Sequence, residues 1–271
     1  MQMPLSDDVV RNPSGMDASG RDCIPLFGLP LSKARSLQHA FSLVRDLLTA
    51  EPAHARLVTF TNPYSVRVAS RDETYRSNLE RMDLVFCDGI GLALAARYCE
   101  RFPMERISFD STSLAPLLFD FAQTSKYSVA LVGGRPGVAK VAADLLAGLY
   151  PGLSIRGVID GYRPWNELID YICRLRPQIV LCGMGAPRQE AFLVALADSG
   201  WKGVGFTCGG YFDHLGEGFH YYPKLIDKFN LRWFYRIARE PRRLGYRNVI
   251  EYGPFWAALA ERLLHGRAPK E

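Results

Sequence analysis

The residues from Gly183 to Glu190 bring together more reactive and ligand-binding groups than any other short stretch of the sequence. An apolar run that predicts a strand precedes them and a helical pattern follows, so they form a strand-to-helix turn. Glycine permits the sharp bend, and Pro187 suits the first position of a helix. The unpaired N–H groups of a first helical turn attract phosphate, and Arg188, Gln189 and Glu190 add a cation, an amide and a carboxylate at the same corner. We predict that a polar, anionic ligand binds at this turn.

Asp88 is a candidate general base. It follows the apolar run Leu84–Cys87 and precedes a glycine, so its carboxylate stands at the end of a predicted strand, partly shielded from water. Desolvation raises a carboxyl pKa toward the range useful for proton abstraction. The competing interpretation is a cap for the following helix, a role that aspartate fills well. Asn62 carries the same two interpretations, and Pro63 at a first helical position favours capping there.

The turn Gly133–Gly137 resembles a dinucleotide-binding fingerprint, with Asp160 near the distance along the chain at which such proteins place a ribose-binding carboxylate. The match is imperfect because the spacer between the first two glycines is missing. A plain glycine-rich turn is the competing interpretation. An NAD-dependent oxidoreductase of the Rossmann type therefore stays as an alternative.

The sequence gives no support to a metal site. It contains no Asp-x-Asp triplet, and its five histidines never occur at His-x-x-x-His spacing. The six cysteines form no close pair with zinc-ligand spacing, and we expect them to be reduced. We therefore predict neither a metal nor a cofactor, and expect helix N-termini and arginines to meet the charge of any bound diphosphate.

Alternating short apolar runs and amphipathic stretches must position these residues. Strands are predicted at 24–29, 57–60, 84–87, 128–132, 153–159, 178–182 and 204–208. Helices are predicted at 33–48, 65–81, 91–99, 114–124, 138–149, 165–175 and 187–199. Strands separated by helices indicate an α/β fold with a Rossmann-like, layered, mostly parallel sheet. Ligands then bind beyond the carboxyl ends of the strands, where most of the candidate residues stand.

Composition divides the chain into three parts. Residues 1–22 are polar and lack periodicity, which predicts a flexible leader without the apolar core of a signal peptide. Residues 23–222 form the predicted catalytic body. Residues 223–271 form a basic, helical appendage, because eight lysines and arginines face two acidic residues between 224 and 247 while the whole chain carries a net charge of only +5.

The appendage interleaves arginines with aromatic residues, as in Trp233–Arg236. This pattern suits the headgroup layer of an anionic membrane, and equally a solvated helix face packed on the body. No known nucleic-acid-reading element occurs, so we expect no nucleic-acid partner. No apolar run is long enough to span a membrane. We expect a cytoplasmic protein, peripheral on the inner face of the cell membrane.

Several of these segments together resemble the WecG/TagA/CpsF family of bacterial glycosyltransferases, also known as glycosyltransferase family 26. The resemblance runs in order from about Leu26 to Arg247. Its segments are Thr59–Asn62, Asp88–Gly91, Arg106, Leu131–Gly137, Tyr150–Leu153, Asp160–Tyr162, Gly185–Glu190, Phe212–Asp213, Trp233–Arg236 and Glu240–Arg243. Each motif alone is weak, whereas their succession at consistent spacing is specific.

The resemblance implies an inverting, metal-independent transfer of a sugar from a UDP-sugar to a polyprenyl-diphosphate-linked saccharide at the membrane surface. Asp88 would deprotonate the acceptor hydroxyl and Asn62 would help to position substrate. The implied donor-binding residues are Arg106, Gly134, Gly185, Gln189, Glu190 and Asp213. Those implied to meet the acceptor diphosphate or the membrane are Arg236, Arg239, Arg243 and Arg247. We expect substitution of Gln189 to weaken UDP-sugar use more than folding.

One segment departs from the family pattern, because Ser113 stands where the family usually has an acidic residue before Leu114. Family members use N-acetylmannosamine, its uronic acid or neutral hexoses. The departure favours a neutral hexose, with UDP-glucose as the first choice of donor in exopolysaccharide assembly of the xanthan type. N-acetylmannosamine and its uronic acid stay as alternatives, and self-association into a homo-oligomer is left open.

Overall fold

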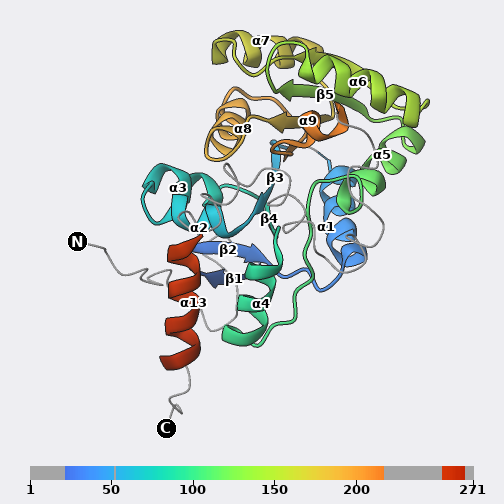
Figure 1. Ribbon diagram of the computed structural model, residues 1–271. Coiled ribbons are helices and arrows are strands. Elements are labelled where there is room, and N and C mark those ends of the chain that lie inside the picture. Colours follow the sequence, from blue (N-terminus) through green and yellow to red (C-terminus); the bar gives the residue numbers. More distant parts are fainter. Residues whose placement is uncertain (1–21, 52, 217–251, 266–271) are drawn as a thin grey trace.

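The computed structural model describes residues 22–51, 53–216 and 252–265 of the chain (Figure 1). Its strands are β1 (Cys23–Leu26), β2 (Leu29–Ser32), β3 (Arg56–Thr61), β4 (Leu84–Cys87), β5 (Ser128–Gly133), β6 (Ser154–Ile159), β7 (Ile179–Gly183) and β8 (Val204–Thr207). The helices are α1 (Leu37–Thr49), α2 (Pro63–Ala69), α3 (Glu73–Glu80), α4 (Ile90–Cys99), α5 (Leu114–Thr124), α6 (Val138–Leu149), α7 (Trp165–Leu175), α8 (Arg188–Asp198), α9 (Tyr211–Gly216) and α13 (Gly253–His265).

Six of the strands form one sheet in the order β4-β3-β8-β7-β5-β6, and every neighbouring pair is parallel. Parallel neighbours need crossover connections, and helices supply them. The sheet therefore confirms the predicted α/β fold with a layered, parallel sheet. Because all six strands point the same way, their carboxyl ends meet at one edge.

Side chains that alternate along the strands build a hydrophobic layer on each face of the sheet. Leu57 of β3 faces the layer formed with α2, α3, α4, α7 and α8, while Val58 faces the layer formed with α1, α5, α6 and α9. On β5, Ala130 and Val132 belong to the first layer and Leu131 to the second. The sheet is thus buried on both sides, as its near-continuous apolar strands require.

The first predicted strand, 24–29, is wrong in form. The segment is a hairpin in which β1 and β2 pair antiparallel, outside the main sheet. Phe27 and Gly28 turn the chain at φ 51° and 76°, the positive values that a two-residue hairpin turn needs. The apolar run alone hid this turn, because phenylalanine is not an ordinary turn residue.

The predicted helix 65–81 is two helices, α2 and α3. The helical conformation is interrupted at Ser70–Asp72, and Asp72 caps α3 by accepting a hydrogen bond from the Tyr75 N–H at 3.0 Å. The helix predicted from Pro187 begins one residue later, with Pro187 as its N-cap residue after a cis peptide bond. The first difference arises because Asp72 starts a new helix inside a continuous helical pattern.

Of the predicted appendage, the structure describes Tyr252 to His265, which contain α13. This helix packs on α2 and α4 (Figure 1). The leader up to Arg21, the body–appendage boundary at 222 and the basic residues Arg236, Arg239, Arg243 and Arg247 lie outside the described residues. Within the described ranges no helix is long and apolar enough to cross a membrane.

Candidate functional site

Asp88 stands directly beyond the carboxyl end of β4. Its N–H donates to the Thr61 carbonyl at 2.7 Å, which extends the β3–β4 pairing by one residue. The N-cap residue of α4 is Gly89, and no side chain caps this helix. The capping interpretation of Asp88 is therefore wrong. Its carboxylate pairs instead with the guanidinium of Arg106, with Oδ1 at 3.4 Å from Nη1.

Asn62 stands at the equivalent point of the neighbouring strand β3. Its Oδ1 accepts from the Tyr64 N–H at 2.9 Å, and the Ser65 hydroxyl accepts from the Asn62 N–H at 3.1 Å. This capping box confirms the capping interpretation. Capping holds the Asn62 side chain in place. Asn62 lies beside the Asp88 loop, since a Cβ built on Gly89 would be 3.8 Å from the Asn62 Cβ. The two residues predicted to be catalytic are thus brought together.

Arg106 lies between two carboxylates. Its Nη1 faces Asp88, and its Nη2 lies 3.4 Å from Asp110 Oδ2. Asp110 is fixed by local donors, because its Oδ2 accepts from the Ser108 hydroxyl at 2.6 Å and its Oδ1 from the Thr112 N–H at 2.9 Å. The guanidinium is therefore held by Asp110 at the position where it meets Asp88.

Asp110 was not recognised from the sequence, where the acidic residue of the family was expected at position 113. The Ser113 side chain is buried, and its hydroxyl accepts from the Ser108 N–H at 3.2 Å. Asp110 lies four residues after Arg106, a spacing that would have signalled an ion pair had the segment been helical. The acidic side chain of this segment that contacts Arg106 is therefore Asp110, three positions before Ser113.

Gln189 points into the protein and joins two loops at the carboxyl ends of β7 and β8. Its Oε1 accepts from the N–H groups of Gly185 at 3.2 Å and Gly209 at 3.1 Å. Its Nε2 donates to Glu190 Oε1 at 3.0 Å, and only 4% of the residue is exposed. Gln189 therefore shapes the predicted anion-binding turn from inside. Of the three polar residues of this turn, Arg188 alone is exposed, and its Nη2 donates to the Gly161 carbonyl at 2.8 Å.

Glu190 is fully buried beneath the same turn. Its Oε1 also accepts from the Thr59 hydroxyl at 2.9 Å, and Thr59 lies 2.8 Å from the Thr207 hydroxyl. Burial raises the pKa of the Glu190 carboxyl, although the hydrogen bonds from Gln189 and Thr59 act against it. This network ties β3, β8 and α8 together below the strand ends. Its two threonines were not recognised from sequence, because a threonine within a strand is usually only a strand former.

The turn Gly133–Gly137 is explained by close backbone approach. Gly133 has φ 139°, and a Cβ there would collide with the Gly183 carbonyl of the neighbouring strand. Gly134 donates its N–H to the same carbonyl at 2.8 Å and accepts from the Gly161 N–H at 3.1 Å. Since backbone pairing accounts for these glycines, the structure gives the dinucleotide interpretation no added support.

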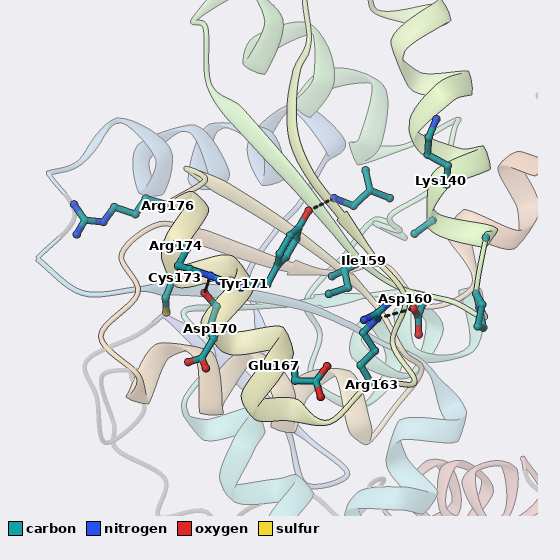
Figure 2. A pocket seen from close by; sticks show the side chains of 14 residues that line it. Lys140, Ile159, Asp160, Arg163, Glu167, Asp170, Tyr171, Cys173, Arg174 and Arg176 are labelled. Atoms are coloured by element: carbon teal, nitrogen blue, oxygen red, sulfur yellow. Dashed lines mark hydrogen bonds and ion pairs between the residues drawn. The ribbon is translucent and has the colours of Figure 1, made fainter.

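A groove of about 1260 Å³ runs along the edge strand β6 between α6 and α7 (Figure 2). At the carboxyl end of β6, Asp160 Oδ2 pairs with Arg163 Nε at 3.1 Å (Figure 2). Desolvation opposes ionisation of Asp160, but the Tyr162 N–H and Arg163 outweigh it and lower the pKa of this carboxyl. Further along, the Tyr171 hydroxyl accepts from the Val158 N–H at 3.2 Å. None of the predicted catalytic residues lines this groove.

The predicted site residues therefore fall into two groups along one edge of the sheet. Asn62, Asp88 and Arg106 meet at the ends of β3 and β4, whereas Gly134, Gly185, Gln189 and Glu190 meet at the ends of β5 and β7. The Thr59–Glu190 hydrogen bond connects the groups. Asp213 is exposed on α9, the helix after β8. Among the described residues, no three histidine, cysteine, aspartate or glutamate side chains gather as a metal-binding group.

The part of the chain that contains this site matches a family of known proteins. The model of the glycosyl transferase WecG/TagA/CpsF family matches residues 24–269. The UDP-Gal:alpha-D-GlcNAc-diphosphoundecaprenol beta-1,4-galactosyltransferase of Shigella boydii is 28% identical over 203 residues, 73% of this chain and 83% of that protein.

Two further relatives are named N-acetylglucosaminyldiphosphoundecaprenol N-acetyl-beta-D-mannosaminyltransferase. The protein of Bacillus subtilis (strain 168) is 28% identical over 188 residues, 69% of this chain and 73% of its own length. That of Bacillus spizizenii (strain ATCC 23059 / NRRL B-14472 / W23) is 26% identical over 212 residues, 78% of this chain and 80% of its own length.

Proposed function

The chain belongs to the WecG/TagA/CpsF family of glycosyl transferases, and from this premise we propose that it moves a sugar from a UDP-sugar onto a polyprenyl-diphosphate-linked saccharide. The names of its relatives support this acceptor class, because each includes a diphosphoundecaprenol-linked sugar. The observation that carries the proposal is the carboxylate of Asp88. It stands at a strand end, does not cap a helix, and lies beside Asn62 and Arg106.

In the proposed reaction, Asp88 accepts the proton of the acceptor hydroxyl while that oxygen forms a bond to the anomeric carbon of the donor sugar. The bond from this carbon to the UDP β-phosphate oxygen breaks at the same time, and UDP leaves with the electron pair. A single displacement of this kind inverts the anomeric configuration. Arg106 orients the Asp88 carboxylate through their ion pair at 3.4 Å.

The N-terminus of α8 is proposed to receive the donor. This helix starts at the carboxyl edge of the sheet, and the positive end of its dipole favours a diphosphate there. Gln189 and Glu190 would act by holding the loop Gly183–Arg188 in shape, and Gly134 by setting its distance from β5. Asp213 on α9 is proposed to contact the donor from the β8 side.

We propose a neutral hexose as the transferred sugar, with glucose as the first donor to test and exopolysaccharide assembly as the setting. The galactosyltransferase relative supports this class, since galactose is also a neutral hexose. N-acetylmannosamine, named in two relatives, is the alternative. The reaction is proposed to need no metal, and to occur on the cytoplasmic face of the membrane with Arg236, Arg239, Arg243 and Arg247 meeting anionic groups.

A panel of UDP-sugars tests the proposal. The protein is incubated with each donor, EDTA and a lipid-diphosphate-linked saccharide, and UDP release and product are measured. We expect one hexose donor to give product, and Asp88→Asn to lower the rate about 10²- to 10⁴-fold with UDP binding retained. Strict dependence on Mg²⁺ or Mn²⁺ would refute the metal-free mechanism. Unchanged turnover of Asp88→Asn would show that Asp88 is not the base, and tight NADH binding without UDP binding would support an oxidoreductase instead.

A further inference from the structure

Helix α4 is apolar on nearly every side and yet lies at the surface. One face, including Leu92, Ala95 and Ala96, is buried in the core. The opposite face exposes 43% of Ile90, 39% of Leu94 and 62% of Tyr98. These three residues recur every fourth position and form a continuous row, here called the α4 stripe. Helices that are hydrophobic all round are normally covered on all sides, so the α4 stripe needs an apolar partner.

The apolar surface continues onto α13. A Cβ built on Gly91 would lie 3.3 Å from Cη2 of Trp256, so the indole ring reaches the helix surface next to the start of the α4 stripe. Trp256 is itself 46% exposed. Leu263 and Leu264 are exposed two turns further along α13. Figure 1 shows the two helices at the same end of the molecule.

Arginines border the far end of the α4 stripe. The Arg97 guanidinium lies 6.0 Å from the ring centre of Tyr98, and Arg101 is exposed just after the helix. Arg35 lies over the nearby Phe102 ring at 5.1 Å. The acidic residue at the end of α4, Glu100, already pairs with Arg262 at 3.1 Å. The border is therefore positive, and exposed Tyr and Trp side chains with adjoining arginines suit the headgroup layer of a membrane.

A second apolar row offers a comparison. Val141, Leu145 and Leu149 are also exposed at every fourth position, on α6 at the opposite end of the molecule (Figure 1). That helix has no aromatic residue, and Lys140 pairs with Asp144 beside the row. Of these two rows in the described part of the chain, the α4 stripe is the one that combines exposed apolar side chains with aromatic residues and a positive border.

We propose that the α4 stripe, extended by Trp256, is a surface that docks on the headgroup layer of an anionic lipid bilayer. The proposal deepens the proposed function and rests on it, since α4 begins two residues after Asp88. Docking through α4 would present the proposed base to an acceptor whose lipid chain stays in the membrane. A second copy of the chain fits less well, because it would bring the same positive charge to the interface, whereas an anionic bilayer complements it.

Sedimentation with vesicles tests the surface. The full chain is mixed with vesicles of phosphatidylcholine and phosphatidylglycerol, and the bound fraction is compared for the wild type and Leu94→Gln/Tyr98→Gln. We expect the vesicle partition coefficient to fall about ten-fold or more. The matched control Val141→Gln/Leu145→Gln should bind like the wild type. Pure phosphatidylcholine vesicles and added salt should weaken wild-type binding, because the arginine border then loses its partners.

Activity separates docking from chemistry. On a water-soluble, short-chain lipid-diphosphate acceptor, Leu94→Gln/Tyr98→Gln should match the wild type, whereas on the long-chain acceptor in vesicles its rate should fall. A wild type without activity on either acceptor would refute the proposed function and leave the vesicle comparison interpretable. If the double variant fails to fold, Tyr98→Gln alone carries the test, because this side chain is the most exposed of the three.

Three outcomes would overturn the docking proposal. The α4 variant could sediment like the wild type, or both double variants could lose binding equally. The wild type could also be a dimer that the α4 variant dissociates in analytical ultracentrifugation, which would assign the surface to a second copy of the chain.

Discussion

Replacing Gln189 by leucine removes three hydrogen bonds from the turn that the donor is proposed to occupy. Two are accepted from the Gly185 and Gly209 N–H groups, and one is donated to Glu190. Leucine fills much of the same volume but offers no acceptor, so two partly buried N–H groups lose their partner. Each hydrogen bond contributes about 1 kcal/mol net, and an unpaired buried group costs about 1–3 kcal/mol. We expect Gln189→Leu to lower the free energy of unfolding by about 2–4 kcal/mol.

For a chain of this size, 1 kcal/mol corresponds to about 2–4 °C in Tm, so the expected drop is about 5–15 °C. Thermal unfolding measures it, and calorimetry with UDP measures the loss of donor-site affinity in the same samples. Gln123→Leu is the matched control, because its amide makes one exposed hydrogen bond to Asp120. The control should change Tm by no more than about 2 °C.

The result that would refute this reasoning is a Gln189→Leu protein with unchanged Tm and strongly weakened UDP binding. Gln189 would then act on the ligand directly, as the sequence alone indicates. Equal losses in Gln189→Leu and Gln123→Leu would also refute it, because a general effect of removing an amide would explain both.

Three further substitutions test other parts of the site. Glu190→Gln should become more stable relative to the wild type as pH rises from the ordinary carboxyl range, about 4.3, toward the raised pKa of Glu190. Over this window the unfolded wild type has released the Glu190 proton while the folded wild type still holds it, so wild-type stability falls. Urea unfolding at several pH values measures this, and a pH-independent difference would contradict a raised pKa. Gly133→Ala should reduce stability by several kcal/mol or prevent folding, because its Cβ would collide with the Gly183 carbonyl. Gly137→Ala is the control and should be milder, because its Cβ would meet no atom within 4 Å. Equal expression and equal Tm for the two variants would show that strands β5 and β7 can separate at this point. Asn62→Ala should lose about 1 kcal/mol of stability, because the side-chain cap of α2 is removed. Asp72→Ala is the control, because it removes the cap of the neighbouring helix α3. A comparison of kcat between the two variants shows whether Asn62 has a role in turnover beyond capping.

The sheet and the position of Asp88 could be predicted because both follow from local pattern. Apolar runs separated by amphipathic stretches leave few arrangements other than a parallel sheet, and the residue after each run then lies at the carboxyl edge. The cap at Asn62 was equally readable, because Asn-Pro-x-Ser carries its own partner at Ser65. For Asp88 the sequence left capping open, and the fold decided by placing Gly89 at the cap.

The direction of a side chain was harder to predict than its position. Gln189 and Glu190 were correctly placed at a helix start, but the first turn of α8 carries both inward, where Thr59 and two loop N–H groups receive them. Thr59 and Gly209 lie far from this turn in the sequence, so no local pattern indicates them. Asp110 was missed for a different reason, because it lies only four residues after Arg106 but their contact forms in an irregular loop rather than a helix.

The hydrogen bond between the Tyr171 hydroxyl and the Val158 N–H affects whether another polypeptide can pair with the edge of the sheet. β6 is an outer strand, and an unpaired outer strand invites another polypeptide to add to the sheet. Tyr171 occupies one of the donors that such a strand would need, and Arg156 adds an exposed charge to the same strand. The β6 edge therefore offers one backbone donor fewer to an incoming strand and places a charge beside it.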